Sequence, residues 1–451
     1  MAGHPRRLIW FCETEYVAEH PDSLKKLRDE IGLTTIMPES HICHTSGFRA
    51  TEEIARRGPF EDWRERTDQY PPAREGIYPP VAGTIGGFDD TALLRVIEAC
   101  RRTGIEIWGH IGLWSYGGDV FPEYAMRDIE GRLLDMRYKQ WGIGLCPSRK
   151  DTNEWTRDCL VDLIRRYDLD GFDVDHARYP APANLHSLLA CGCSFCQEEA
   201  GRLGFDFGRM KEGLLRLRAG LNALTREQVL RMGQARPGFW EFLAYLGEDG
   251  AVLEWLRFRA LVMAERMREF RTAVQGAGGA DKVFGSDVFP PSIALLGGHS
   301  YEDWERGADY LTGGSSHGGV VGWATTVTNL ASEWAPALCR TVADLQEGEA
   351  LQLVYRMFGY DDLDLPLAVA GLREGPLPLA QMFAREVSRL KAQIRGRMPL
   401  YPPVSVEGEP ELVRPLLETV VDNQCEGALF SGLDPENDET LTLIRKVLSE
   451  G

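Results

Sequence analysis

The acidic stretch at residues 167–180 constrains the fold of this chain more than any other segment. It reads YDLDGFDVDHARYP and follows an amphipathic segment at 155–167. The Asp170-Gly171 pair predicts a tight turn, after which apolar and acidic residues alternate as they do in a short strand. Asp173 and Asp175 lie two positions apart, so their side chains share one face of that strand. A carboxylate inside a parallel sheet is unfavourable, so the pattern predicts a strand that ends in acids at a functional edge.

Strand and helix patterns alternate along the whole chain, which is typical of parallel βαβ units. Eight such units predict an α/β fold, a (β/α)8 TIM barrel formed as one domain by residues 1–451. A doubly wound open sheet is the alternative, but it requires a glycine-rich phosphate loop where Cys12-Glu13-Thr14-Glu15 stands. The expected strands are 7–12, 34–37, 105–113, 169–175, 283–288, 309–312, 351–360 and 426–431.

Three long segments interrupt this alternation. Loops follow the second and third strands, at 41–90 and 114–146, and loops of this length in a compact domain are usually functional or form small subdomains. A mostly helical insertion, 181–276, follows the fourth strand and contains three closely spaced cysteines. We expect these segments to decorate one end of the barrel.

Composition excludes several classes of partner. The formal net charge is −18 and no basic run is visible, so we expect neither nucleic acid nor an anionic membrane as a partner. No stretch approaches the ~18 apolar residues of a spanning helix, and the apolar run at 8–12 is too short for a signal peptide. Ten cysteines in a chain of 451 residues are not a disulfide scaffold. We expect a cytoplasmic protein; the sequence leaves the oligomeric state, including a homo-oligomer, open.

The residues that follow the strands form an acidic and aromatic set, and in a barrel they face one mouth. Glycosidic cleavage needs two carboxylates: one protonates the leaving oxygen, and the other attacks or activates water. Asp175 and Asp287 lie on adjacent strands, so we predict them as the catalytic pair, about 5–9 Å apart. Aromatic faces stack on sugars. The predicted substrate contacts are Glu13, His110, Trp114, Asp173, His176, Arg178, His317 and Asp361.

Other interpretations of these residues stay open. One aspartate of the acidic strand could cap the next segment while the other pairs with Arg178, which is a structural role. The barrel could be a sugar-binding protein without catalysis. It could also be a metal-dependent hydrolase, although no HExxH motif occurs and no His-x-His follows the first strand. The metal-binding candidates would then be His41, His44, His110, Asp175, His176 and His317.

A second signal is the Cys191-x-Cys193-x-x-Cys196 motif, which places three thiols on one loop. Cysteines this close in a reducing compartment favour a soft metal such as zinc. Cys146 is the best fourth ligand because it lies one βα unit earlier, and His186 is the alternative. Reduced thiols without metal are the simpler interpretation. We expect a structural zinc and no organic cofactor.

Three motifs together resemble those of the TIM-barrel glycoside-hydrolase-like proteins, the hypothetical glycosyl hydrolases related to family-10-like glycosyl hydrolases. They are the CPS turn at 146–148, the DGFDVDHARYP strand at 170–180 and the cysteine motif at 191–196. The cysteine layout is also similar to the zinc cluster of the family forty-two β-galactosidases. The resemblance covers roughly residues 141–200.

The resemblance implies a barrel, a sugar-like substrate, Asp175 as the acidic rim residue, and zinc on Cys146, Cys191, Cys193 and Cys196. His176 departs from the pattern, because these proteins tend to have an aromatic residue there. The Asn-Glu acid/base pair of family forty-two has no counterpart on this strand, so Asp287 is assigned as the acid from strand position. The sequence therefore predicts an intracellular glycoside hydrolase acting on a small oligosaccharide or glycoside, with the stereochemical outcome open.

Overall fold

The structure is a computed structural model, and it describes residues 6–39, 90–114, 122–134, 144–175, 177–180, 188–235, 238–247, 250–313, 322–374 and 376–450. All strand pairs are parallel, in the order β7-β6-β5-β4-β3-β2-β1-β9-β8. The strands are β1 (Arg7–Glu13), β2 (Thr35–Glu39), β3 (Glu106–Gly112), β4 (Gly171–Asp175), β5 (Val283–Val288), β6 (Leu311–Gly313), β7 (Leu400–Tyr401), β8 (Pro403–Ser405) and β9 (Gly427–Ser431).

The two ends of this order meet and close the sheet. β7 and β8 are separated only by Pro402, whose carbonyl accepts a hydrogen bond of 2.9 Å from the Leu429 amide in β9. On the other side, β7 pairs with β6. Residues 400–405 therefore form one strand position of the barrel. The strand is interrupted at Pro402, because proline has no amide hydrogen to donate to the ladder. The predicted (β/α)8 TIM barrel is confirmed.

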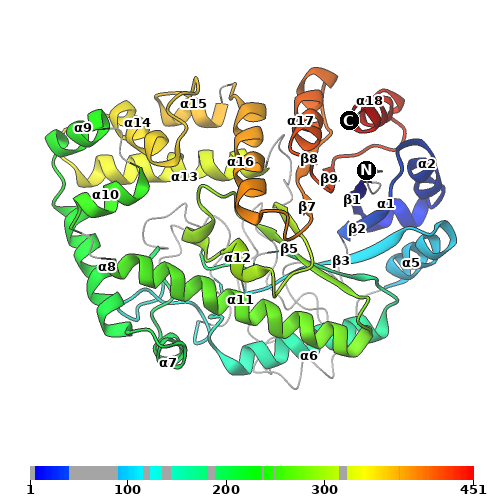
Figure 1. Ribbon diagram of the computed structural model, residues 1–451, viewed down its shortest axis with the longest axis horizontal. Helices are drawn as coiled ribbons and strands as arrows, with labels where there is room; N and C mark the ends of the chain where they lie inside the picture. The colour runs from blue at the N-terminus through cyan, green and yellow to red at the C-terminus, as the bar shows by residue number, and fades with distance from the viewer. Residues whose placement is uncertain are drawn as a thin grey trace.

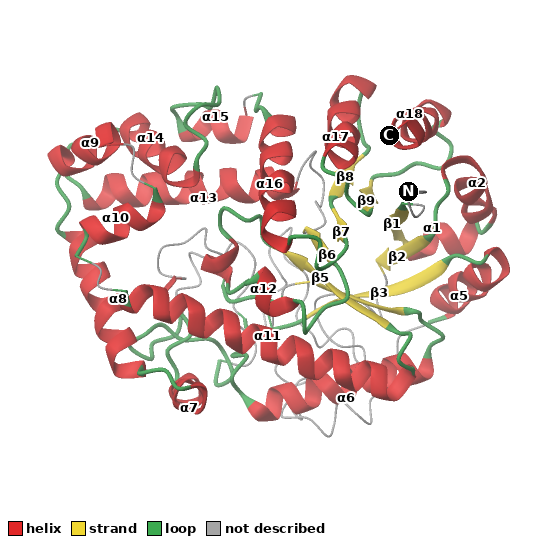
Figure 2. Cartoon of the chain, in the orientation of Figure 1, coloured by secondary structure: helices red, strands yellow, loops and turns green. Residues whose placement is uncertain are grey.

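Helices surround the barrel and extend to one side of it (Figures 1 and 2). The long helix α11 packs along α6, and the group from α8 to α10 and α13 to α15 lies to the left of the strands in Figure 1. No helix in the described ranges has both the length and the hydrophobicity to span a membrane. The helices are α1 (Thr14–Glu19), α2 (Asp22–Ile31), α5 (Thr91–Thr103), α6 (Lys150–Arg166), α7 (Ser194–Leu203), α8 (Phe207–Asn222), α9 (Arg226–Ala235), α10 (Phe239–Tyr245), α11 (Ala251–Gly278), the 3-10 helix η4 (Ala294–Gly297), α12 (Tyr301–Trp304), α13 (Gly322–Thr341), α14 (Glu347–Phe358), α15 (Val369–Glu374), α16 (Leu379–Ile394), α17 (Pro410–Asp422) and α18 (Asp438–Glu450).

One expected strand is wrong. Residues 351–360 were expected to form the seventh strand, but they belong mainly to helix α14, which begins with a capping box between Gln346 and Glu349. The segment is apolar because α14 is buried over most of its surface. Asp361 therefore follows a helix remote from the strands in Figure 1, with a carboxylate oxygen 3.8 Å from Nε of Arg356. It does not stand at the end of a strand.

The lumen of the barrel is filled with side chains and changes character along its axis. An apolar cluster fills the amino-terminal part; it contains Ile9, Met37, Trp108, Tyr310, Tyr401 and Leu429. Successive inward positions on a strand are two residues apart, so His110 lies above Trp108 and Thr312 above Tyr310. Ionisable side chains therefore line the lumen toward the carboxyl ends of the strands, where barrel enzymes have their active sites.

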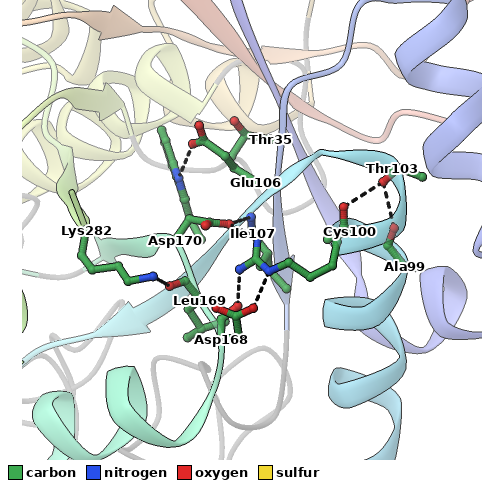
Figure 3. Close-up of polar contacts among 12 residues, drawn as sticks. Thr35, Ala99, Cys100, Thr103, Glu106, Ile107, Asp168, Leu169, Asp170 and Lys282 are labelled. Atoms are coloured by element: carbon green, nitrogen blue, oxygen red, sulfur yellow. Dashed lines mark hydrogen bonds and ion pairs between the residues drawn. The ribbon is translucent and has the colours of Figure 1, made fainter. Parts of the chain in front are cut away.

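The Asp170-Gly171 turn fixes the position of β4 along the barrel axis. One Asp170 carboxylate oxygen accepts a hydrogen bond from the Ile107 amide at 2.8 Å (Figure 3). The same oxygen accepts a second hydrogen bond, from Arg101, at 2.9 Å. A Cβ at Gly171 would lie 2.1 Å from the Val283 carbonyl oxygen, so only glycine fits beside β5. The turn predicted from sequence therefore fixes where the acids of β4 emerge.

Candidate functional site

Four ionisable side chains gather in the lumen at the carboxyl ends of β3, β4 and β5. His110 and Asp173 are opposite one another in the β3–β4 register, and Nδ1 of His110 lies 3.2 Å from Oδ2 of Asp173. The other ring nitrogen, Nε2, lies 3.8 Å from Oδ2 of Asp175. Asp173, Asp175 and Asp287 are 0%, 9% and 4% exposed. We call these four residues the acid cluster.

Asp173 is the most deeply buried member of the acid cluster. Its Oδ1 accepts a hydrogen bond of 2.9 Å from the Tyr310 hydroxyl, and its Oδ2 faces His110. Tyr310 can reach it because Gly285 leaves room: a Cβ there would lie 2.1 Å from the tyrosine ring. Asp173 has no exposed surface, and its described contacts are with side chains in the barrel lumen.

Asp287 lies on the other side of Asp173 and is held by Thr312. The Thr312 hydroxyl donates to the Asp287 carboxylate and also lies 3.4 Å from Oδ1 of Asp173. One ligand atom each from His110, Asp173 and Asp287 lie within 4.8 Å of one another. Two acids and an imidazole at this spacing can share protons, and such a set can also hold a metal ion.

Burial and like charge shift the protonation of the acid cluster. Burial, together with the charges of Asp173 and Asp175, raises the pKa of Asp287 well above its usual range, against the opposing effects of His110 and Thr312. Burial alone would lower the pKa of His110, but its hydrogen bond with Asp173 and the three aspartate charges raise it to about 9. The cluster therefore favours the charged form of His110 and disfavours ionisation of Asp287.

The loops after β4 and β5 are tied together behind the acid cluster. His299 accepts a hydrogen bond from the Phe289 amide at its Nδ1 (2.9 Å) and donates from Nε2 to the Ala177 carbonyl (3.0 Å). Burial lowers the pKa of His299 to about 3, so this ring stays neutral. Arg178 is buried with its guanidinium 5.5 Å from the Phe289 ring centroid. These contacts join Ala177 and Arg178 to the loop after β5.

Several predicted substrate contacts occupy other environments. Glu13 ends β1 with an exposed side chain. Trp114 is only 4% exposed, donates from Nε1 to Asn153 at 2.9 Å and packs against Phe270, so it offers little surface for stacking on a sugar. Asp361 is not brought to the acid cluster by any strand, as described above. Five predicted or alternative residues lie outside the described residues: His41, His44, His176, His186 and His317.

Sequence reasoning missed three polar residues that complete the site. Tyr310 and Thr312 hold the aspartates, and their alternation in the expected strand 309–312 was the available signal. His299 joins the two loops, but it lies in no strand and no motif marked it. Its role follows only from the packing.

The four predicted thiols meet at one point beside the barrel. Sγ of Cys146 lies 3.4 Å from that of Cys193 and 3.5 Å from that of Cys196, and Cys193 lies 3.7 Å from Cys196. Cys191 completes the group, with all four sulfurs within 4.8 Å of one another. Sulfurs placed about 2.3 Å from a zinc ion form a tetrahedron with edges of about 3.8 Å. The spacing therefore fits a tetrahedral metal ion.

Two polar groups lie beside the sulfurs. The Arg127 amide donates to Sγ of Cys191 at 3.3 Å, and Sγ of Cys196 donates to the Ser148 hydroxyl at 3.3 Å. Burial raises the pKa of the Cys146 and Cys196 thiols, whereas hydrogen bonds with the other three cysteines lower the pKa of Cys193. A bound cation would favour the thiolate form of all four. The residues fit a closed site compatible with zinc.

The comparisons with known proteins agree with the barrel. No family model and no curated protein matches the sequence. Among solved structures, the chain is similar to the glycoside hydrolase domain of PgaB (BpsB) from Bordetella bronchiseptica, with a TM-score of 0.53 and 10% identity over 99% of both chains. It is also similar to the catalytic domain of β-amylase from Paenibacillus polymyxa (TM-score 0.46, 10% identity, 98% of both chains).

A third similar structure is α-L-fucosidase isoenzyme 2 from Paenibacillus thiaminolyticus (TM-score 0.46, 13% identity). The match covers 99% of this chain and 49% of the fucosidase chain, so this chain spans about half of that length. The similarity to the PgaB (BpsB) domain, at 10% identity, shows the fold alone.

Proposed function

We propose that the protein is a glycoside hydrolase that cleaves a small oligosaccharide or glycoside with Asp175 and Asp287. The observation that carries this proposal is the acid cluster itself. It concentrates three buried aspartates around one histidine at the carboxyl ends of adjacent barrel strands. Clustered like charges are unfavourable for stability, so they are expected where chemistry needs them.

In this proposal Asp287 is the proton donor. Its raised pKa keeps a proton available for the leaving oxygen. Asp175 is the more exposed of the two acids and acts as the nucleophile or as the base for water. Asp173 and His110 are positioning residues, because they are buried and act through the other two. His110 also balances the negative charge that Asp175 carries.

The protonation states make this mechanism pH-dependent. The reaction needs Asp287 protonated and Asp175 ionised at the same time. Because the pKa of Asp287 is raised, the alkaline limb of the rate profile should lie above the usual range of an aspartate. Product anomers from an early time point would distinguish retention from inversion.

The test is a panel of aryl glycosides and oligosaccharides, with wild type compared with Asp175→Asn and Asp287→Asn. On any substrate that wild type turns over, both variants should lose activity by about 10³-fold. Wild-type turnover in both variants would remove the two residues from the mechanism. Calorimetric binding of a sugar without any product would instead indicate a non-catalytic sugar-binding barrel.

A metal-dependent hydrolase is the second candidate, favoured by the close grouping of His110, Asp173 and Asp287. The two candidates differ in their response to chelators. Activity that survives EDTA supports the glycosidase, whereas activity that is lost to EDTA and restored by added metal supports the metal-dependent reaction.

We also propose that Cys146, Cys191, Cys193 and Cys196 bind one structural zinc ion. The sulfur spacing and the donors around it support this assignment. Bound there, zinc would cross-link the loops after β3 and β4 and perform no chemistry on the substrate. The described cysteines form no disulfide, in keeping with a reducing, intracellular setting for the enzyme.

A further inference from the structure

A fully buried arginine without a carboxylate partner lies near the cysteine cluster. Arg259, on helix α11, is 0% exposed, and no carboxylate within the described ranges pairs with it. By contrast, Arg257 on the same helix is half-exposed and forms an ion pair with Asp303. A buried guanidinium is unfavourable unless a negative charge lies nearby, so the neighbourhood of Arg259 must supply one.

Neutral groups are the direct contacts of Arg259. Its two terminal nitrogens donate to the carbonyls of Leu188 (3.3 Å) and Leu296 (3.1 Å), and its guanidinium lies 4.5 Å from the Tyr179 ring centroid. Nε has no hydrogen-bond partner among the described residues. Burial lowers the pKa of this group to about 10, so it stays positive at neutral pH. Carbonyls and a ring do not neutralise a full charge.

The cysteine cluster can provide the missing charge. Arg259 donates to the carbonyl of Leu188, three residues before Cys191, and lies within electrostatic range of Cys191 and Cys196. Four thiolates around one divalent cation carry a net charge of −2. A pair of disulfides would be neutral. The metal–thiolate centre, which the sulfur spacing fits, therefore carries a charge that matches a buried cation.

The contacts of Arg259 also join parts of the site. Leu188 precedes the cysteine motif, Tyr179 belongs to the loop that follows Asp175, and Leu296 lies in η4 after β5. Trp255, one helical turn earlier on α11, donates to the same Leu188 carbonyl at 2.9 Å. One guanidinium therefore contacts the cysteine segment and the loops that follow both catalytic candidates.

We propose that Arg259 is the counter-ion of a metal centre in which all four cysteines bind a divalent cation as thiolates, and that it links this centre to the loops after β4 and β5. The proposal rests on metal binding by the four cysteines and is independent of glycosidase activity. Arg259 is a positioning residue in this account, because it contacts neither metal nor substrate.

The test separates the charge of Arg259 from its hydrogen bonds. Arg259→Gln keeps amide donors for the carbonyls but removes the charge, whereas Arg259→Lys keeps the charge and loses the planar fork. Arg257→Gln is the matched control on the same helix. Each full-length protein is loaded with Co²⁺ to record the thiolate-to-cobalt charge-transfer band, and Zn²⁺ affinity is measured by competition.

We expect Arg259→Gln to weaken Zn²⁺ binding roughly 10- to 100-fold, the range typical for partners of metal ligands. By linkage, metal should then stabilise this variant less than wild type against heat. Arg259→Lys should retain most of the affinity, and Arg257→Gln should equal wild type.

Wild-type affinity in Arg259→Gln, or equal losses in the Gln and Lys variants, would overturn the counter-ion role. If Arg259→Gln does not fold, Arg259→Lys decides alone: retained affinity supports the role and a 100-fold loss overturns it. Absence of the cobalt band in wild type would refute the metal site itself, a different failure from that of Arg259.

Discussion

The two ends of the barrel use the same kinds of charged residue in opposite ways. At the amino end, Glu106 pairs with Arg7, and Arg101 binds both Asp168 and Asp170. Each of these carboxylates has a guanidinium beside it. At the carboxyl end, three aspartates face one another around a histidine. The ion pairs at the amino end connect strands and loops. The acid cluster at the carboxyl end places like charges close together at the end of the barrel where enzymes of this fold bind their ligands.

The difference arises within six residues of one segment. Asp170 precedes β4 and accepts a backbone amide of β3, so it belongs to the amino end. Asp173 and Asp175 lie inside the strand, where their side chains enter the lumen. Composition does not separate these roles. Position along the strand separates them, because a residue's position along the barrel axis determines whether its carboxylate lies beside an arginine or beside another acid.

The largest expected contrast is in turnover. Asp287→Asn should reduce turnover by about 10³-fold because it removes the proton donor. Asp168→Asn, at the amino end, should stay within about twofold of wild type, because Asp168 is a partly exposed partner of Arg101. Steady-state rates on the same substrate provide the comparison. Equal losses in both variants would mean that the carboxyl end has no special role.

The next contrast concerns pH and stability. The folded-state pKa of His110 is raised to about 9 by Asp173, Asp175 and Asp287. Its contribution to stability should therefore be complete below about 6.5, the usual histidine pKa, and should be lost as pH rises through 9. The free energy of unfolding in urea should fall by roughly 3 kcal/mol over this range. His110→Gln should flatten the slope, and an unchanged slope in that variant would contradict the assignment.

The cysteine cluster should behave like the amino end, as a stabilising device. Removing bound metal should lower the melting temperature, on the order of 5 °C, because metal binds the folded chain. The residual folded enzyme should keep its turnover. Calorimetry with and without a chelator, run beside activity assays, measures both effects. Lost turnover in a chain that is still fully folded would move the cluster into the catalytic site.

The smallest expected effect is on the free energy of unfolding, and its sign should differ between substitutions at the two ends of the barrel. Arg101→Gln should destabilise the fold by about 1 kcal/mol, because it breaks partly exposed ion pairs with Asp168 and Asp170. Asp287→Asn should be neutral or stabilising, since it relieves a buried acid among acids. Urea titration of both variants tests this directly. Destabilisation by Asp287→Asn larger than that by Arg101→Gln would show that the acid cluster serves stability.

Strand pattern predicted most of the fold, and its one error has a physical cause. The seventh strand position of the barrel, residues 400–405, is short and contains Pro402 and Pro403, so its sequence does not predict a strand. The apolar run at 351–360 gave a strand signal instead, because most of its residues are apolar. Its polar residues Gln352 and Arg356 are four positions apart, which is the spacing of a helix and was the available signal.

The grouping of the candidate residues was predictable where spacing or strand position determined it. The four cysteines were predicted because one loop supplies three and the neighbouring βα unit supplies the fourth. The histidine and aspartates were predicted from strand ends. Tyr310, Thr312 and Arg259 were not predicted, since their roles depend on which side chains face one another across the barrel or between helix and loop. Contacts of that kind follow from packing.

Carboxyl protonation is the quantity on which this account depends most directly. Nuclear magnetic resonance of protein labelled with ¹³C at aspartate carboxyls would report it, with Asp287→Asn identifying the resonance. We predict one aspartate carboxyl in wild type that is still protonated at neutral pH and whose resonance is missing from the variant. If all aspartates titrate in the ordinary acid range, the acid cluster holds no proton and cannot supply the proposed donor.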